Sequence, residues 1–169
     1  MKNDTPGQSA GQTVEWFGSV TAGYSDSEDR MWLKLVNQER EVVIWVTRRL
    51  IAALIAQGFS FLKGNREPAE WALEHTKAIE PFVARGGDQP PTRSQSLKEH
   101  AQSVGLAYEI QLTRRDDKNL FIFKAAQGQF GVPCSDQETH CLVELFFQRA
   151  KGAGWGLEAP WLFDQAAMP

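Results

Sequence analysis

The chain has 169 residues, of which 42% are hydrophobic and 23% are charged, and its formal net charge is −3 at pH 7. These proportions are those of an ordinary globular domain and exclude a largely disordered chain. The slight acidic excess excludes the broad positive field that draws proteins to nucleic acid, and no apolar run is long enough to span a membrane.

The start of the chain predicts a cytoplasmic protein. Residues 1–12 are polar and rich in Gly, Ser, Thr, Asn and Gln, so we expect a mobile tail there. This segment lacks the apolar run of a signal peptide. Cys134 and Cys141 are too few for a disulfide framework, so we expect free thiols.

A β-meander is predicted for the first part of the chain. Apolar and polar residues alternate from Val14 to Tyr24, which is typical of one half-buried strand. Further strands are expected at Met31–Val36 and Val42–Val46, joined by a tight turn at Asn37–Arg40. Both faces of the third strand are apolar, which indicates a central position in a sheet, covered on both sides.

Two helices are predicted next. Apolar residues recur at helical spacing after Thr47, which can cap the first turn, and Gly64 ends this helix. Pro68 suits the start of a second helix, in which Trp71 and His75 lie on one side.

The second part of the chain repeats the order of strands and then a helix. A half-buried strand over 106–113, with its even-numbered residues facing the core, is followed by strands over 120–126 and within 128–133. Ser135 and Glu138 form a capping-box pattern, which predicts the start of a long final helix.

We therefore predict an α+β fold with two antiparallel β-meanders, which either share one sheet or form a sandwich, and a packing helix after each meander. One compact domain is expected over 13–163, with halves at 13–80 and 97–156. The prolines and glycines of 81–96 indicate a mobile linker between the halves, and a mobile tail is expected at 164–169. Only the pattern of elements recurs, so a duplication stays a hypothesis.

The tripeptide Thr-Arg-Arg occurs at 47–49 and again at 113–115. The first copy falls where a strand passes into a helix, and the second falls in a hairpin turn. We interpret the repetition as coincidence.

The first predicted helix has no charged side chain between Arg49 and Lys63. Its apolar stripe explains one side, but the other side has small neutral residues where a solvated helix would carry Lys or Glu. This helix is either sandwiched between the sheet and the second helix, or it forms a subunit interface in which small residues allow close approach. The candidate interface residues are Ala52, Ala53, Ala56, Gln57 and Ser60.

Arg48 and Arg49 form a candidate anion-binding site. They lie at the predicted start of a helix, where backbone N–H groups and a guanidinium fork can bind phosphate or sulfate. Positive charge opposes the helix dipole at this end, so it needs an acidic partner from this chain or an external anion. The alternative is that both side chains are simply solvated.

Other patterns are explained without a ligand. Phe121 and Phe123 share a strand face but lack the basic pattern of an RNA-binding strand, so we expect them in the core. Cys134, His140 and Cys141 have no second ligand pair at zinc-like spacing, so we expect no metal and no cofactor.

The last helix is expected to bury its side at 142, 143, 145 and 146 and to expose His140, Glu144 and Gln148. His140 and Glu144 would then be a solvated i, i+4 pair. Arg149 falls on the apolar side, where it either extends past the helix end or meets a carboxylate.

These observations favour a non-enzymatic cytoplasmic protein that acts through protein–protein contact, as a homodimer that uses the small-residue side of the first helix or an exposed sheet edge. The alternative is an accessory protein that binds nucleic acid or another anionic ligand through Arg48 and Arg49. The sequence has no nucleophile elbow, phosphate loop or dinucleotide fingerprint, so no catalytic residue is assigned. A third hypothesis is an enzyme whose site is assembled from distant residues, with His75 or His140 as candidates.

Overall fold

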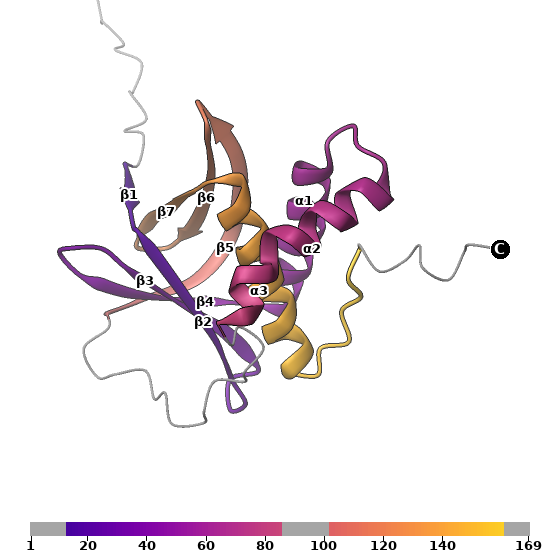
Figure 1. Cartoon of the computed structure of the whole chain (residues 1–169). Helices are drawn as coiled ribbons and strands as arrows, with labels where there is room; N and C mark the ends of the chain where they lie inside the picture. Colours follow the sequence, from indigo (N-terminus) through magenta and orange to yellow (C-terminus); the bar gives the residue numbers. More distant parts are fainter. Residues whose placement is uncertain (1–12, 86–101, 161–169) are drawn as a thin grey trace, which may run out of the picture.

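The structure is a computed structural model that describes residues 13–85 and 102–160. These residues form three α-helices and one mixed sheet of seven strands, which confirms the α+β prediction (Figure 1). The meanders are not two separate sheets, because β4 and β5 pair in parallel and join the strands into the order β1-β7-β6-β5-β4-β3-β2.

The elements have the following bounds: β1 (Val14–Trp16), β2 (Ser19–Ser25), β3 (Arg30–Val36), β4 (Glu41–Val46), α1 (Arg48–Lys63), α2 (Pro68–Ala84), β5 (Gln102–Arg115), β6 (Lys118–Ala125), β7 (Gly128–Cys134) and α3 (Asp136–Gly152).

The prediction of one strand from Val14 to Tyr24 is wrong, because the chain forms two strands at opposite ends of the strand order. β1 pairs in parallel with β7, whereas β2 pairs antiparallel with β3. Between them, Phe17 N donates to Gly131 O at 2.9 Å and Gly18 N donates to Val36 O at 3.0 Å. The two ends of the sheet therefore approach each other at this link, and the sheet is curled.

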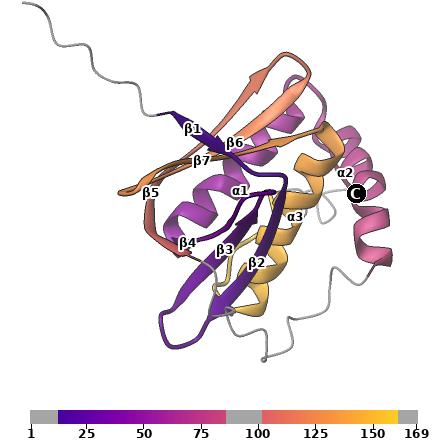
Figure 2. The ribbon, with the colours of Figure 1, turned by 90° about the vertical axis from the view of Figure 1, so that its left-hand side faces the viewer.

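The core lies between the sheet and the helices, which Figure 1 shows on one side of the strands. Figure 2 shows the β2–β4 strands and the β5–β7 strands splaying in different directions. Phe121 and Phe123 of β6 are fully buried in this core, as predicted, together with Phe146 of α3. α1 and α3 pack closely, and a Cβ added at Gly58 would lie 2.5 Å from a methyl group of Val143.

Local signals place the helix ends as the sequence predicts. The Thr47 hydroxyl accepts a bond from Leu50 N at the start of α1, and Gly64 ends the helix with a φ of 53°, which favours glycine. At the start of α3, Ser135 and Glu138 form both bonds of the capping box.

The linker predicted over 81–96 begins too early. α2 continues through Pro81 to Ala84, and the backbone N–H of Arg85 donates to Phe82 O. The predicted linker beyond Arg85 and both predicted tails lie outside the described residues.

The first half of β5 presents the opposite face from the one predicted. Leu106 and Tyr108 are 40% and 59% exposed, whereas Ala107 between them is buried. The register with β6 shifts between Ala107 and Glu109, so a β-bulge reverses the alternation of the strand. Beyond the bulge, the register continues regularly to the hairpin turn.

Candidate functional site

The small-residue side of α1 is open to solvent. Ala53, Ala56, Gln57 and Ser60 are exposed, and Ala52 is half-buried. The opposite side is buried through Ile51, Leu54, Ile55, Gly58 and Leu62. Within the described part of the chain, α1 is therefore not sandwiched, which was one of the two alternatives.

An open groove runs beside this exposed side of α1. It has a volume of about 500 Å³, and Ala56, Gln57 and Ser60 of α1 form one wall. Phe61 and Leu112, the latter from β5, complete the lining. None of the described residues that line the groove is charged, and among them only Gln57 and Ser60 have side chains that form hydrogen bonds.

Arg48 and Arg49 are both exposed at the first turn of α1. The positive charge of Arg48 is among the causes that lower the pKa of Asp29, after the hydrogen bonds from Tyr24 and Trp155. An acid of this chain therefore lies near Arg48 and compensates part of its unfavourable position at the helix start.

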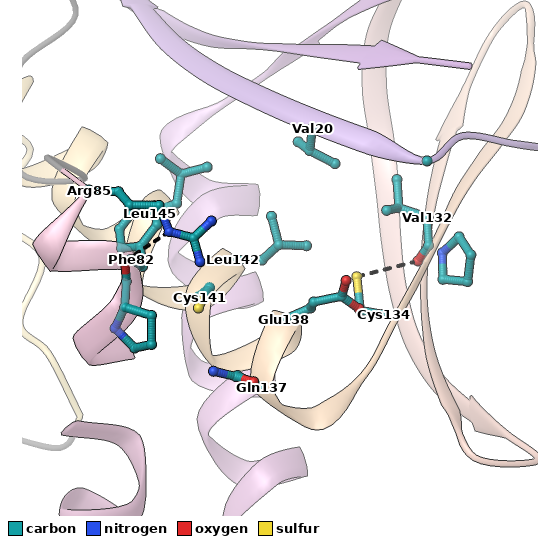
Figure 3. A pocket seen from close by; sticks show the side chains of 13 residues that line it. Val20, Phe82, Arg85, Val132, Cys134, Gln137, Glu138, Cys141, Leu142 and Leu145 are labelled. Atoms are coloured by element: carbon teal, nitrogen blue, oxygen red, sulfur yellow. Dashed lines mark hydrogen bonds between the residues drawn. The ribbon is translucent and has the colours of Figure 1, made fainter. Parts of the chain in front are cut away.

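A cleft of about 420 Å³ lies between β2, β7, the C-terminal end of α2 and the first turns of α3 (Figure 3). Its walls include Val20, Phe82 and Leu142, and the Arg85 guanidinium extends over the cleft, where its Nε donates to Pro81 O at 3.1 Å.

Cys134 and Cys141 also line this cleft, and both are free thiols. Burial raises the pKa of Cys134 to about 12 and also raises that of Cys141. Both groups are thiols rather than thiolates near neutral pH, so the cleft holds no activated cysteine nucleophile.

A buried polar cluster joins α2 to α3. His140 and Glu144 are 2% and 6% exposed, so the prediction of a solvated pair is wrong. α2 covers this side of α3 and brings His75 between them, with His75 Nε2 2.9 Å from Glu144 Oε2 and His75 Nδ1 2.9 Å from His140 Nδ1. The Trp71 ring stacks on His75 with centroids 4.8 Å apart.

The carboxylate end of this cluster sets the direction of its hydrogen bonds when His75 is neutral. Glu144 can only accept when ionised, so His75 Nε2 donates to it, and in the neutral form of His75 the Nδ1 atom is then an acceptor. His140 Nδ1 must then donate to His75 Nδ1, which leaves His140 Nε2 with a free lone pair. Gln148 Nε2 donates to the other Glu144 oxygen at 2.6 Å.

The pKa directions of His140 and Glu144 indicate the charge of each group. Burial, followed by the charge of His75, lowers the pKa of His140 to about 4, although Glu74 and Asp136 oppose the shift. Burial would raise the pKa of Glu144, but the hydrogen bonds from His75 and Gln148 outweigh it and hold the pKa below its usual value. At neutral pH, His140 is therefore neutral and Glu144 is ionised.

His140 borders a small polar cavity of about 40 Å³, which has room for a few oxygen-sized atoms. Two ion pairs, Arg66 with Glu74 and Arg114 with Asp136, form its rim. Phe61 and Leu62 complete the lining. His140 Nε2 is buried and has no hydrogen-bond partner among the described residues, and Glu74 Oε1 lies 4.0 Å away.

The sequence indicated His75 and His140 only as separate candidates. The signals for the cluster were the i, i+4 pairs Trp71–His75 and His140–Glu144, but no sequence pattern shows that these two helix faces meet. Arg149 Nε donates to the backbone oxygen of Ala22 at 3.0 Å, a contact that the sequence did not predict. The two copies of Thr-Arg-Arg occupy different structural positions, as predicted, but the second copy lies at the end of β5 and not in the hairpin turn.

Comparisons with known proteins give no relative for this chain. Within 13–85 and 102–160, no three His, Cys, Asp or Glu side chains are grouped to hold a metal ion. None of the helices in those ranges has the length and hydrophobicity of a membrane-spanning segment. No protein-family model, no curated protein and no solved structure matches the sequence.

Proposed function

We propose that the protein is a non-enzymatic cytoplasmic protein that acts through protein–protein contact as a homodimer, with α1 as the interface. The observation that carries this proposal is the exposed, uncharged side of α1, formed by Ala53, Ala56, Gln57 and Ser60. Two free thiols suit the reducing conditions of the cytoplasm.

A second copy of this chain is the occupant that fits this surface. In a two-fold dimer the same patch meets itself, so a patch without charge avoids repulsion between identical groups. Small side chains let two helices approach closely, and the groove toward Leu112 can receive side chains of the partner's helix. The 16 residues of α1 give a length of about 24 Å, which is comparable to the width of a standard interface of about 800 Å² per partner.

The test is the molar mass in solution, measured by light scattering over a range of protein concentrations. We expect the wild-type protein to be a dimer and Ala53→Glu to be a monomer, because two buried carboxylates would meet without partners near the two-fold axis. Circular dichroism should show that the variant keeps its fold, since Ala53 is exposed in the single chain.

Ala84→Glu is the matched control, because Ala84 is also an exposed helix residue but lies at the end of α2. It should leave the dimer intact. A wild-type monomer at every concentration would reject the proposal. A dimer that survives Ala53→Glu but is lost on substitution in β2 would move the interface to the sheet edge.

A further inference from the structure

The cavity beside His140 combines a buried unpaired nitrogen with two guanidinium groups at its rim. His140 Nε2 has no hydrogen-bond partner among the described residues, although its ring is almost fully buried. Buried polar atoms of folded proteins are nearly always paired, so an unpaired one that faces a cavity indicates a bound polar group. This cavity adjoins the α1 groove at Phe61, but its polar groups belong to other residues than those of the exposed α1 side.

The rim can release donors to a ligand. Arg66 and Arg114 are each paired with one carboxylate, but both pairs are about half exposed to solvent. Exposed ion pairs contribute little free energy, so an incoming anion can compete for these guanidinium groups. The Phe61 ring lies under Arg114, with the guanidinium carbon 5.9 Å from the ring centroid, and helps to hold its direction.

The interior of the cluster can take up a proton without exposing a charge. When His140 Nε2 gains a proton, the proton on its Nδ1 can move to His75 Nδ1 across 2.9 Å. His75 then carries the positive charge and keeps its hydrogen bond to the Glu144 carboxylate. His140 remains neutral, and its Nε2–H now points at the cavity as a donor.

We propose that this cavity binds an oxyanion group, either a carboxylate or a tetrahedral anion such as sulfate or phosphate, together with one proton. One anion oxygen enters the cavity and accepts a hydrogen bond from His140 Nε2. Arg66 and Arg114 bind the remaining oxygens at the rim.

The charges around His140 explain why the proton is needed. Glu74 and His75 face it from α2, Arg66 from the segment between α1 and α2, Arg114 from β5, and Asp136 and Glu144 from its own helix. Among the residues that the structure describes, three carboxylates face two guanidinium groups, so these groups sum to a net charge of −1 when both imidazoles are neutral. Uptake of one proton neutralises the site and removes the repulsion of an anion.

The experiment is calorimetric titration of the full chain with sodium sulfate, with sodium chloride at equal ionic strength as the blank. Sulfate has no proton to exchange near neutral pH, so titration in two buffers of different ionisation enthalpy counts the protons that the protein takes up. We expect saturable binding with uptake of about one proton, and an affinity that falls about tenfold per unit rise in pH. A second titration, with sodium acetate in place of sodium sulfate, tests whether the cavity binds a planar carboxylate.

Variants separate the parts of the site. Arg66→Ala with Arg114→Ala should weaken binding by about tenfold or more, because two charge-assisted contacts are lost. His140→Gln keeps an N–H donor but removes the titrating pair, so its binding should show no proton uptake and no pH dependence. Arg48→Ala with Arg49→Ala is the matched control and should bind like the wild type.

Binding of sulfate, acetate or both with proton uptake supports the proposal, and the anion that binds identifies the geometry of the group. The proposal is overturned if neither anion binds saturably, if binding takes up no proton, or if the double variant of Arg66 and Arg114 binds normally. Loss of binding in the Arg48 and Arg49 variant instead would place the anion at the start of α1. Since Arg66 and Arg114 are exposed, their variants remain informative even if His140→Gln is poorly folded.

Discussion

α1 and α3 distribute polarity in opposite ways. The exposed side of α1 carries no charge, whereas a buried side of α3 carries His140 and Glu144. A surface helix usually places charges toward solvent and apolar groups toward the core, so both helices depart from the rule. The comparison teaches that a departure in either direction marks a face with a partner: α2 is the partner of the polar face on α3, and a second chain is the partner that we propose for α1.

The largest effect is expected where a buried charge partner is removed. Glu144→Ala should lower the free energy of unfolding by about 3 kcal/mol, because His75 and Gln148 both lose their acceptor inside the protein. Urea denaturation followed by circular dichroism measures this change. Glu80→Ala, at an exposed position of α2, should change stability by less than about 0.5 kcal/mol. Equal effects of the two substitutions would mean that the buried cluster does not hold α2 against α3.

Acid should weaken the polar face of α3. The pKa of His140 is about 4 in the folded protein, whereas an unburied histidine has a pKa of 6.5. The contribution of neutral His140 to the free energy of unfolding is therefore complete above about pH 6.5. That contribution is lost as the pH falls toward 4, and the loss is at most about 3 kcal/mol. Urea denaturation in sulfate-free buffer across this range measures the slope. His140→Gln should flatten it, and an unchanged slope in this variant would assign the acid sensitivity to other groups.

The smallest effect is expected inside the contact between α1 and α3. Gly58→Ala should destabilise the protein by about 1 kcal/mol, because the clash with Val143 exceeds the gain in helix propensity. Ser60→Ala on the exposed side should alter stability by only a few tenths of a kcal/mol. Thermal unfolding measures both changes. If Gly58→Ala stabilised the protein, Val143 of α3 would have to move aside at little cost in free energy. The buried and exposed sides of α1 would then tolerate substitution more equally than we propose.

Local chemistry determined the parts of the fold that the sequence predicts well. Thr47, Gly64 and the capping box at Ser135 act within a few residues, so their signals identify the helix ends without knowledge of the rest of the molecule. The strands after residue 30 follow from periodicity in the same way. For β5, the pattern predicts the strand but not its buried face, because a single bulge residue reverses the alternation.

Long-range contacts determined what the sequence could not predict. His140 and Glu144 have the spacing of a solvated pair, and only the approach of α2, with His75 65 residues away from His140, buries them. Val14 to Tyr24 similarly has the pattern of one strand, but its two parts pair with strands from different halves of the chain. For α1 the sequence allowed two arrangements, and the packing of α3 on one side leaves the other side exposed.

The short link between β1 and β2 has a consequence for synthesis on the ribosome. β2 can pair with β3 as soon as about twenty residues have followed the link, but β1 must wait for β7, more than a hundred residues later. Until then, Phe17 lacks its position beside Phe130, and Trp16 lacks the bare backbone of Gly131 on which it packs. The nascent chain therefore carries an unpaired aromatic segment for most of its elongation, and pairing of its earliest strand is among the last steps of folding.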